Sequence, residues 1–223
     1  PVNNIVDVTN YVMLELGHPL HAFDRGVVSN DNFVIRTAKQ DEILETLDHK
    51  KRELFEDDIL VTNGEQVLGL GGVMGGLNSE ITAETSEIIL EVATWNHIMI
   101  RKTSQRHMLR SDAAQRFEKS LDPEIAGLAM RRACELILKI CPGAELAGPL
   151  TDVYPEKPKK ITITIDVEEV QSKIGAPLKE AEMANHLKWL GFGVTKSKKG
   201  FLKISVPSFR ATKDINIEDD LVE

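Results

Sequence analysis

The first residues of the chain place apolar side chains at helical spacing. Val8, Val12 and Leu16 follow one another four positions apart, and Gly17 with Pro19 ends the pattern. We therefore predict a helix over residues 5–16.

Short runs rich in β-branched and aliphatic residues follow the helix and predict strands. The runs are residues 32–37, 43–47, 58–62, 66–70 and 87–92. Asn63-Gly64 is typical of a tight hairpin between the third and the fourth of them. From residue 95 to residue 140 the pattern turns helical, with helix-start signals at Ser111-Asp112 and Asp122-Pro123.

A connector rich in proline and lysine, residues 154–160, indicates a boundary between two domains. Beyond it, alternation at 161–165, helical patterns at 167–174 and 179–190 and an apolar run at 201–206 predict a small α+β domain. We place the domains at residues 1–152 and 160–223. The fold class is α+β, and the first domain is expected to be a mixed β-sheet or sandwich with helices packed on it.

Composition narrows the classes of protein that fit. The 223 residues are 42% hydrophobic, enough for one or two packed domains. The chain contains no apolar run long enough to span a membrane and no export signal at its start, so we expect a cytoplasmic protein. Because it begins at Pro1 and stops within a helical pattern, we also expect a fragment of a longer polypeptide.

The net charge and the two cysteines argue against extensive nucleic-acid binding and against a cysteine metal site. A formal net charge of −8 argues against a surface devoted to neutralising phosphates, so any nucleic-acid contact should be local. Cys134 and Cys141 lack the spacing of metal ligands and are expected to be reduced thiols.

A glycine-rich stretch, residues 68–77, is the first candidate for chemistry. Its five glycines could let a ligand approach bare backbone, or they could form a turn between strands, which we prefer from the local sequence. The spacing does not match a dinucleotide-binding fingerprint.

Three further features have both a functional and a structural interpretation. His21, in the run His-Pro-Leu-His-Ala-Phe-Asp that ends at Asp24, could be an acid–base group or a hydrogen-bonded structural residue. Glu91 ends an apolar strand, where a solvated carboxylate is more usual than one held in a pocket. The basic stretch 101–119 is typical of a solvated helix face, and it could also contact a phosphate backbone.

The order of these segments closely resembles the beta chain of bacterial phenylalanyl-tRNA synthetase. The resemblance rests on residues 2–24, 71–76, 110–123 and 207–223, and it covers nearly the whole chain. It implies that residues 1–152 are the family's editing domain. It also implies that residues 160–223 begin a small domain, truncated at its C-terminal end, that is related to helix-turn-helix folds.

The activity that this resemblance implies is hydrolysis of tyrosine wrongly attached to tRNA(Phe), within a ligase that joins phenylalanine to tRNA using ATP. The implied partners are tRNA(Phe) and the alpha chain, in a heterotetramer of two alpha and two beta chains. No nucleophile appears in the sequence, so we expect a positioned water to attack the ester. The alternative is a structural or RNA-contacting module without hydrolysis of its own.

The resemblance also assigns site residues. Glu91 would read the tyrosine hydroxyl, and Gly75 would form a main-chain wall. The positions expected near the ester and its water are His21, Thr9 and Asn10, and those expected to line the pocket are Ser111 and Ala113. Acidic positions that bind Mg²⁺ at the contact with the alpha chain would be Asp214, Asp220 and Glu223. We expect that magnesium site to be incomplete without the alpha chain, and ATP to bind elsewhere in the full enzyme.

Overall fold

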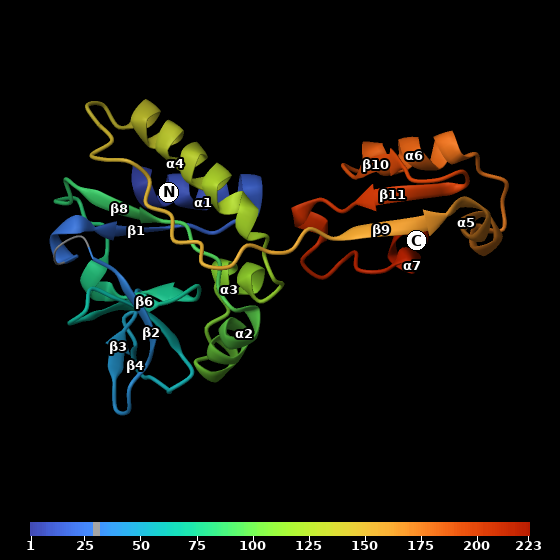
Figure 1. Cartoon of the computed structure of the whole chain (residues 1–223). Helices are drawn as coiled ribbons and strands as arrows, with labels where there is room; N and C mark the ends of the chain where they lie inside the picture. Colours follow the sequence, from blue (N-terminus) through green and yellow to red (C-terminus); the bar gives the residue numbers. More distant parts are fainter. Residues whose placement is uncertain (29–31) are drawn as a thin grey trace. The chain divides into compact units, whose positions relative to one another are not determined.

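The computed structural model describes residues 1–28 and 32–223 and divides the chain into two units, Pro1–Pro149 and Leu150–Glu223 (Figure 1). The division falls before the predicted connector at residues 154–160. Within the described residues, no helix is long and apolar enough to cross a membrane.

The predicted first helix is α1, Asn4–Leu16. The Asn3 side chain accepts a hydrogen bond from the Val6 backbone N–H and so satisfies a free donor at the helix start. Gly17 ends the helix in the left-handed conformation, with φ of 74°, which glycine adopts without steric cost. The apolar stripe of α1 packs against α4, Ala126–Ile140, mainly through Val8, Val12 and Ala133.

In the part of the first unit that the structure describes, the strands form three antiparallel sheets. One pairs β1 (His21–Asp24) with β8 (Ile88–Glu91), and a hairpin pairs β3 (Ile43–Glu45) with β4 (Lys51–Glu53). The four-stranded sheet has the order β2 (Val34–Thr37), β5 (Ile59–Thr62), β6 (Val67–Leu70) and β7 (Met74–Gly75). Asn63-Gly64 forms the predicted hairpin between β5 and β6. The glycine-rich stretch becomes β6, β7 and the tight turn between them.

Two short helices, α2 (His97–Arg106) and α3 (Asp112–Phe117), lie together beside the sheets (Figure 1). Ile100 and Phe117 carry their apolar faces into a core that includes Leu60 and Leu70 of the four-stranded sheet. The helix predicted from Asp122-Pro123 begins as a 3₁₀ turn, Pro123–Ile125, which continues into α4. Further 3₁₀ turns among the described residues of this unit are Arg25–Val27 and Leu77–Ser79.

The second unit is built around one antiparallel sheet of order β10 (Gly193–Lys196), β11 (Phe201–Ser205) and β9 (Thr162–Asp166). Its helices are α5 (Val167–Ile174), α6 (Glu180–Trp189) and the short α7 (Glu218–Val222), with a 3₁₀ turn at Ser208–Arg210. Leu202 and Ile204 of β11 are buried with Met183 and Leu187 of α6. The predicted α+β class is confirmed for the chain, whereas the relation of this unit to helix-turn-helix folds stays a prediction.

Candidate functional site

A cavity of about 80 Å³ lies within the first unit, among β1, β8, the glycine-rich turn and α3. A single water needs roughly 10–15 Å³ of such space, so the cavity has room for several waters. Its lining brings together His21, Gly75, Glu91 and Ala113 from the predicted site. The other lining residues that bear on the argument are Gly71, Gly72, Trp95 and Phe117.

The strand pairing of β1 with β8 explains why His21 and Glu91 meet. The two residues are direct partners in the antiparallel register. Direct partners in such a pair point to the same face of the sheet, with Cβ atoms roughly 4.5–5.5 Å apart. Both side chains therefore reach the cavity from one surface, although they are far apart in the sequence.

His21 is held without a polar partner. Its Nε2 atom is buried and accepts or donates no hydrogen bond among the described residues. The ring meets Phe23 edge to face, with ring centroids 4.5 Å apart. Burial lowers the pKa of His21 to about 4, so the imidazole is neutral at pH 7.

The backbone of Gly75 packs directly against the His21 ring. A Cβ atom added at Gly75 would lie 2.6 Å from Cε1 and 2.8 Å from Nε2 of His21, closer than real Cβ atoms approach other atoms. The backbone at residue 75 and the imidazole can therefore touch only because residue 75 has no side chain.

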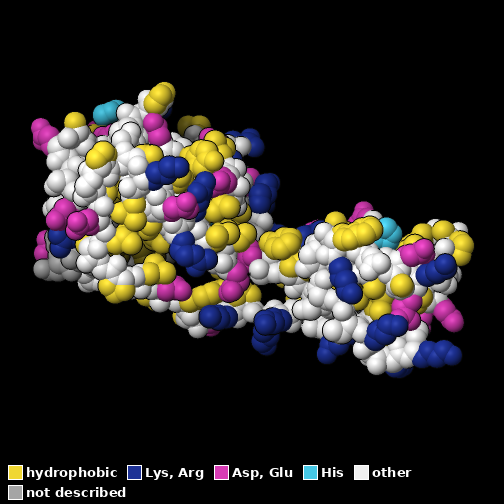
Figure 2. All heavy atoms as spheres, turned by 90° about the horizontal axis from the view of Figure 1, so that it is seen from above, with side chains coloured by type: hydrophobic (Ala, Val, Ile, Leu, Met, Phe, Trp, Pro, Cys, Tyr) yellow, Lys and Arg dark blue, Asp and Glu magenta, His cyan; other side chains and the backbone are white. Residues whose placement is uncertain are grey.

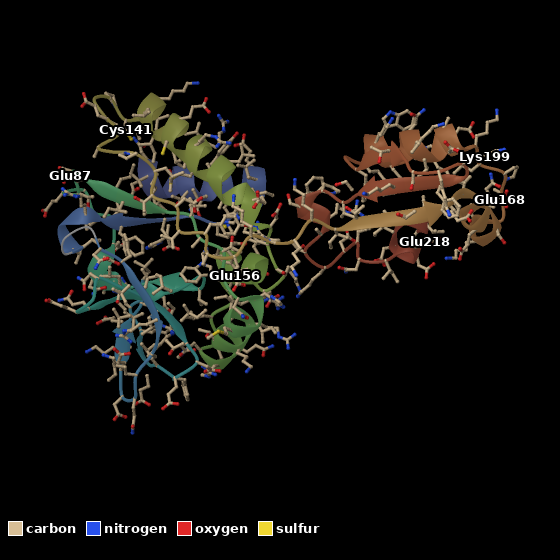
Figure 3. The ribbon with its side chains drawn as sticks, in the orientation of Figure 1. Glu87, Cys141, Glu156, Glu168, Lys199 and Glu218 are labelled. Atoms are coloured by element: carbon tan, nitrogen blue, oxygen red, sulfur yellow. The ribbon has the colours of Figure 1, made fainter. Side chains whose placement is uncertain are left out.

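Glu91 faces the same space without a cation. Among the described residues, no Lys or Arg lines the cavity, and burial raises the pKa of Glu91 to about 7. Glu87, which precedes β8, lies at the outer edge of the unit in Figure 3 and pairs with Arg25 at 2.5 Å. Glu91, at the end of β8, thus lines the cavity instead of lying in solvent as its local sequence favours, whereas Glu87, before β8, is exposed.

Trp95 was not singled out from the sequence, yet it shapes the cavity. A Cβ atom at Gly71 or Gly72 would lie 2.8 Å or 2.6 Å from the Trp95 indole, so the ring covers the bare backbone of the turn. No local pattern links Gly71-Gly72 to Trp95, which lies 23 residues further along the sequence. The buried Nε2 of His18 lies 3.1 Å from the Ala93 carbonyl oxygen, and this contact holds the segment between Glu91 and Trp95.

Three other predicted residues lie outside the lining. The Ser111 hydroxyl donates to the Val73 carbonyl at 2.6 Å and accepts from the Ala114 N–H at the start of α3. Thr9 is buried in α1, where its hydroxyl donates to the Val6 carbonyl at 2.8 Å, and Asn10 is exposed on the same helix. Ser111 supports a wall of the cavity, whereas the structure does not bring Thr9 or Asn10 to it.

The three predicted magnesium ligands lie in the second unit and do not form a donor set. Asp214 pairs with the Arg210 guanidinium. Asp220 accepts from the backbone N–H groups of Asn216 and Ile217 at 2.7 and 2.9 Å, and these bonds lower its pKa. Across residues 1–28 and 32–223, no three His, Cys, Asp or Glu side chains meet in a way that could hold a metal ion. Asp214, Asp220 and Glu223 therefore do not fit a magnesium ion in this structure.

Comparisons with known proteins agree with the division of the chain into the units Pro1–Pro149 and Leu150–Glu223. Residues 1–142 match the model of the B3/4 domain, and residues 163–223 match that of the tRNA synthetase B5 domain. The chain is 39% identical over 223 residues to the phenylalanine–tRNA ligase beta subunit of Solibacter usitatus, covering all of this chain and 29% of that protein. It is 40% identical over 224 residues to the beta subunit of Staphylococcus epidermidis, again over the whole chain and 27% of that protein.

A solved structure with a similar course is an N-terminal fragment of the phenylalanyl-tRNA synthetase beta subunit from Pyrococcus horikoshii. The match has a TM-score of 0.49 and 12% identity, and it covers 98% of this chain and 63% of that one. The chain spans less than a third of the length of the two curated relatives above. With a B3/4 domain followed by a B5 domain, it belongs to the phenylalanine–tRNA ligase beta-subunit family.

Proposed function

We propose that the cavity of the first unit hydrolyses the ester of tyrosine wrongly attached to tRNA(Phe), as the editing site of a phenylalanine–tRNA ligase. The observation that carries the proposal is the cross-strand pair of His21 and Glu91, which faces a small cavity closed by bare Gly75 backbone. The family in which these two domains occur together supports the same activity.

An enzyme that selects phenylalanine needs such a second site for a physical reason. An apolar pocket rejects a substrate with one added hydroxyl only by about a hundredfold. A site that hydrogen-bonds the hydroxyl discriminates better, because the analogue without it leaves a buried polar group unpaired. Glu91 is suited to this role, since no Lys or Arg in the cavity competes for its carboxylate.

His21 positions groups in this proposal and does not abstract the proton. A base with a pKa of about 4 removes a proton from water inefficiently at neutral pH. Its unpartnered Nε2 atom is instead available to the water or to the ester, and Phe23 and Gly75 fix the ring from two sides. The water attacks the carbonyl carbon of the ester from a fixed position, the bond from that carbon to the ribose oxygen breaks, and the proton of the water passes to the leaving ribose oxygen. No covalent intermediate with the protein forms.

The whole protein is proposed to act as an ATP-dependent, magnesium-requiring ligase in the cytoplasm, with tRNA(Phe) and an alpha chain as partners in an assembly of two alpha and two beta chains. ATP and the ion would be held by parts of that assembly outside this chain. Neither ATP nor the ion takes part in the proposed hydrolysis.

A deacylation assay tests the function. Tyr-tRNA(Phe) would be incubated with the full ligase that contains this chain and with the chain alone, and release of tyrosine followed. We expect rapid release by the ligase and slow release by the chain, whose net charge of −8 gives it weak affinity for tRNA. If the full ligase does not accelerate release, the chain is the structural or RNA-contacting module of the alternative.

A further inference from the structure

The helices beside the cavity carry a local excess of positive charge in an acidic chain. Residues 97–119 hold six Lys or Arg and only two acidic residues, whereas the whole chain has a net charge of −8. On the face drawn in Figure 2, cationic and anionic side chains are interspersed over the molecule. The segment 97–119 is therefore a local exception to the charge of the chain.

Half of these cations are neutralised by neighbours. Arg106 pairs with Asp57 and Asp58 at 2.5 and 2.6 Å. Arg116 lies 3.1 Å from Asp112, and Lys119 lies 3.4 Å from Glu118.

The remaining three cations, Arg101, Lys102 and Arg110, are exposed. They form no ion pair with any residue in the parts of the chain that the structure describes. We call these three residues the basic rim.

Packing ties the basic rim to the cavity wall. A Cβ atom at Gly72, which lines the cavity, would lie 3.0 Å from Cδ1 of Ile100, the neighbour of Arg101. Ser111, which follows Arg110 in the sequence, donates a hydrogen bond from its hydroxyl to the carbonyl oxygen of Val73, another lining residue. Arg101 in α2 and Arg110 between α2 and α3 thus directly follow or precede, in the sequence, a residue that packs on the cavity wall.

The turn between α2 and α3 presents an apolar side chain beside the basic rim. Met108 is 89% exposed and has a φ of 50°, a conformation that non-glycine residues rarely adopt. Hydrogen bonds on both sides of it, from the His107 N–H to the Thr103 carbonyl and from the Leu109 N–H to the Ser104 carbonyl, hold the turn in that shape. An exposed methionine two residues before Arg110 suits a ligand that has both anionic groups and flat apolar ones.

We propose that the basic rim, Arg101, Lys102 and Arg110, binds the phosphates of an RNA whose 3′ end reaches the cavity. The identity of the RNA as an aminoacylated acceptor end rests on the proposed function, whereas binding of RNA phosphates by the basic rim does not. Three free cations suit a phosphodiester backbone, because each neutralised phosphate releases counterions. The small number of contacts agrees with an acidic chain in which nucleic-acid binding is local.

Fluorescence anisotropy tests the proposal. The probe is a fluorescein-labelled RNA hairpin with a single-stranded CCA 3′ end, titrated with the chain at several KCl concentrations. The rim variant combines Arg101→Gln, Lys102→Gln and Arg110→Gln. The control variant combines Lys50→Gln, Lys51→Gln and Lys139→Gln, which are exposed residues outside α2, α3 and the cavity lining and which change the net charge equally.

We expect the rim variant to bind about tenfold or more weakly at low salt. The slope of log affinity against log salt should become shallower by about 2 to 3, as each lost phosphate contact removes about 0.7–0.9. The control variant should bind as the wild type does. Equal weakening in both variants would show that only net charge matters, and unchanged binding by the rim variant would also overturn the proposal.

The same variants separate this proposal from the proposed function. If the rim variant loses RNA binding and the wild-type ligase releases no tyrosine from Tyr-tRNA(Phe), the basic rim stands and editing fails. If the wild-type ligase edits and the rim variant keeps both its RNA affinity and its rate of deacylation, editing stands and the basic rim fails.

Discussion

Replacing Glu91 by glutamine should change how the stability of the first unit depends on pH. Glutamine keeps the shape of the side chain and removes its ionisation. Burial raises the pKa of Glu91 from 4.5 to about 7 in the folded chain. The folded state therefore binds this proton more tightly than the unfolded state does, and the wild-type free energy of unfolding falls as pH rises from about 4.5 to about 7.

The size of this effect follows from the shift. One pKa unit corresponds to about 1.4 kcal/mol, so a shift from 4.5 to about 7 gives ~3 kcal/mol as an upper value, which solvent at the partly exposed carboxylate reduces to about 2. His21 works in the opposite sense, because its contribution is present above about pH 6.5 and is lost as pH falls through about 4. His21 is present in both wild type and Glu91→Gln. Its contribution therefore drops out of the difference between their free energies of unfolding when the pKa of His21 is the same in both.

Urea unfolding followed by tryptophan fluorescence measures this difference. A Trp189→Phe background leaves Trp95, in the cavity wall, as the reporter of the first unit. Between about pH 4.5 and about pH 8.5, Glu91→Gln should gain roughly 2 kcal/mol relative to the Glu91 parent. A difference that stays flat over this range would refute the inference that Glu91 is desolvated and unpaired.

Three further substitutions test the packing around the cavity. Gly75→Ala should displace the His21 ring, cost about 1–3 kcal/mol in chemical denaturation and abolish deacylation, so a stable and active variant would contradict the close contact. Asp58→Asn should cost about 3–5 kcal/mol, because the fully buried carboxylate accepts from Thr103, Arg106 and His107, and a loss below about 1 kcal/mol would be inconsistent with that network. Ala113→Trp should fill the cavity and stop hydrolysis of Tyr-tRNA(Phe) in a protein whose thermal unfolding is otherwise normal, and unchanged hydrolysis would remove Ala113 from the substrate's path.

Elements with local signals were predictable from the sequence. The helix predicted over residues 5–16 is α1, Asn4–Leu16, because the spacing of its apolar side chains and Gly17 lie within the helix itself. The hairpin at Asn63-Gly64 was predictable for the same reason. α4 begins later than Asp122-Pro123 predicts, because Asp122 caps a 3₁₀ turn that precedes the α-helix. The sequence signal is the same for the start of a 3₁₀ turn and of an α-helix.

The site was less predictable, because it depends on the pairing of two strands that are far apart in the sequence. Glu91 enters the cavity only because β8 pairs with the four-residue strand β1 in the register that places it opposite His21. A shift of one residue would turn both side chains to the other face, and no local pattern determines that register. Thr9 and Ser111 were assigned by resemblance, and in the structure their hydroxyls bond to nearby carbonyls instead of facing the cavity.

The rates at which the full ligase hydrolyses Tyr-tRNA(Phe) and Phe-tRNA(Phe), compared between wild type and Glu91→Ala, test the account most directly. If Glu91 accepts a hydrogen bond from the tyrosine hydroxyl, its loss removes roughly 1.5–3 kcal/mol, so tyrosine release should slow about ten- to a hundredfold. Release of phenylalanine should slow less or even rise, which moves the ratio of the two rates toward one. An equal loss for both substrates, or no change in either, would contradict the claim that Glu91 reads the hydroxyl.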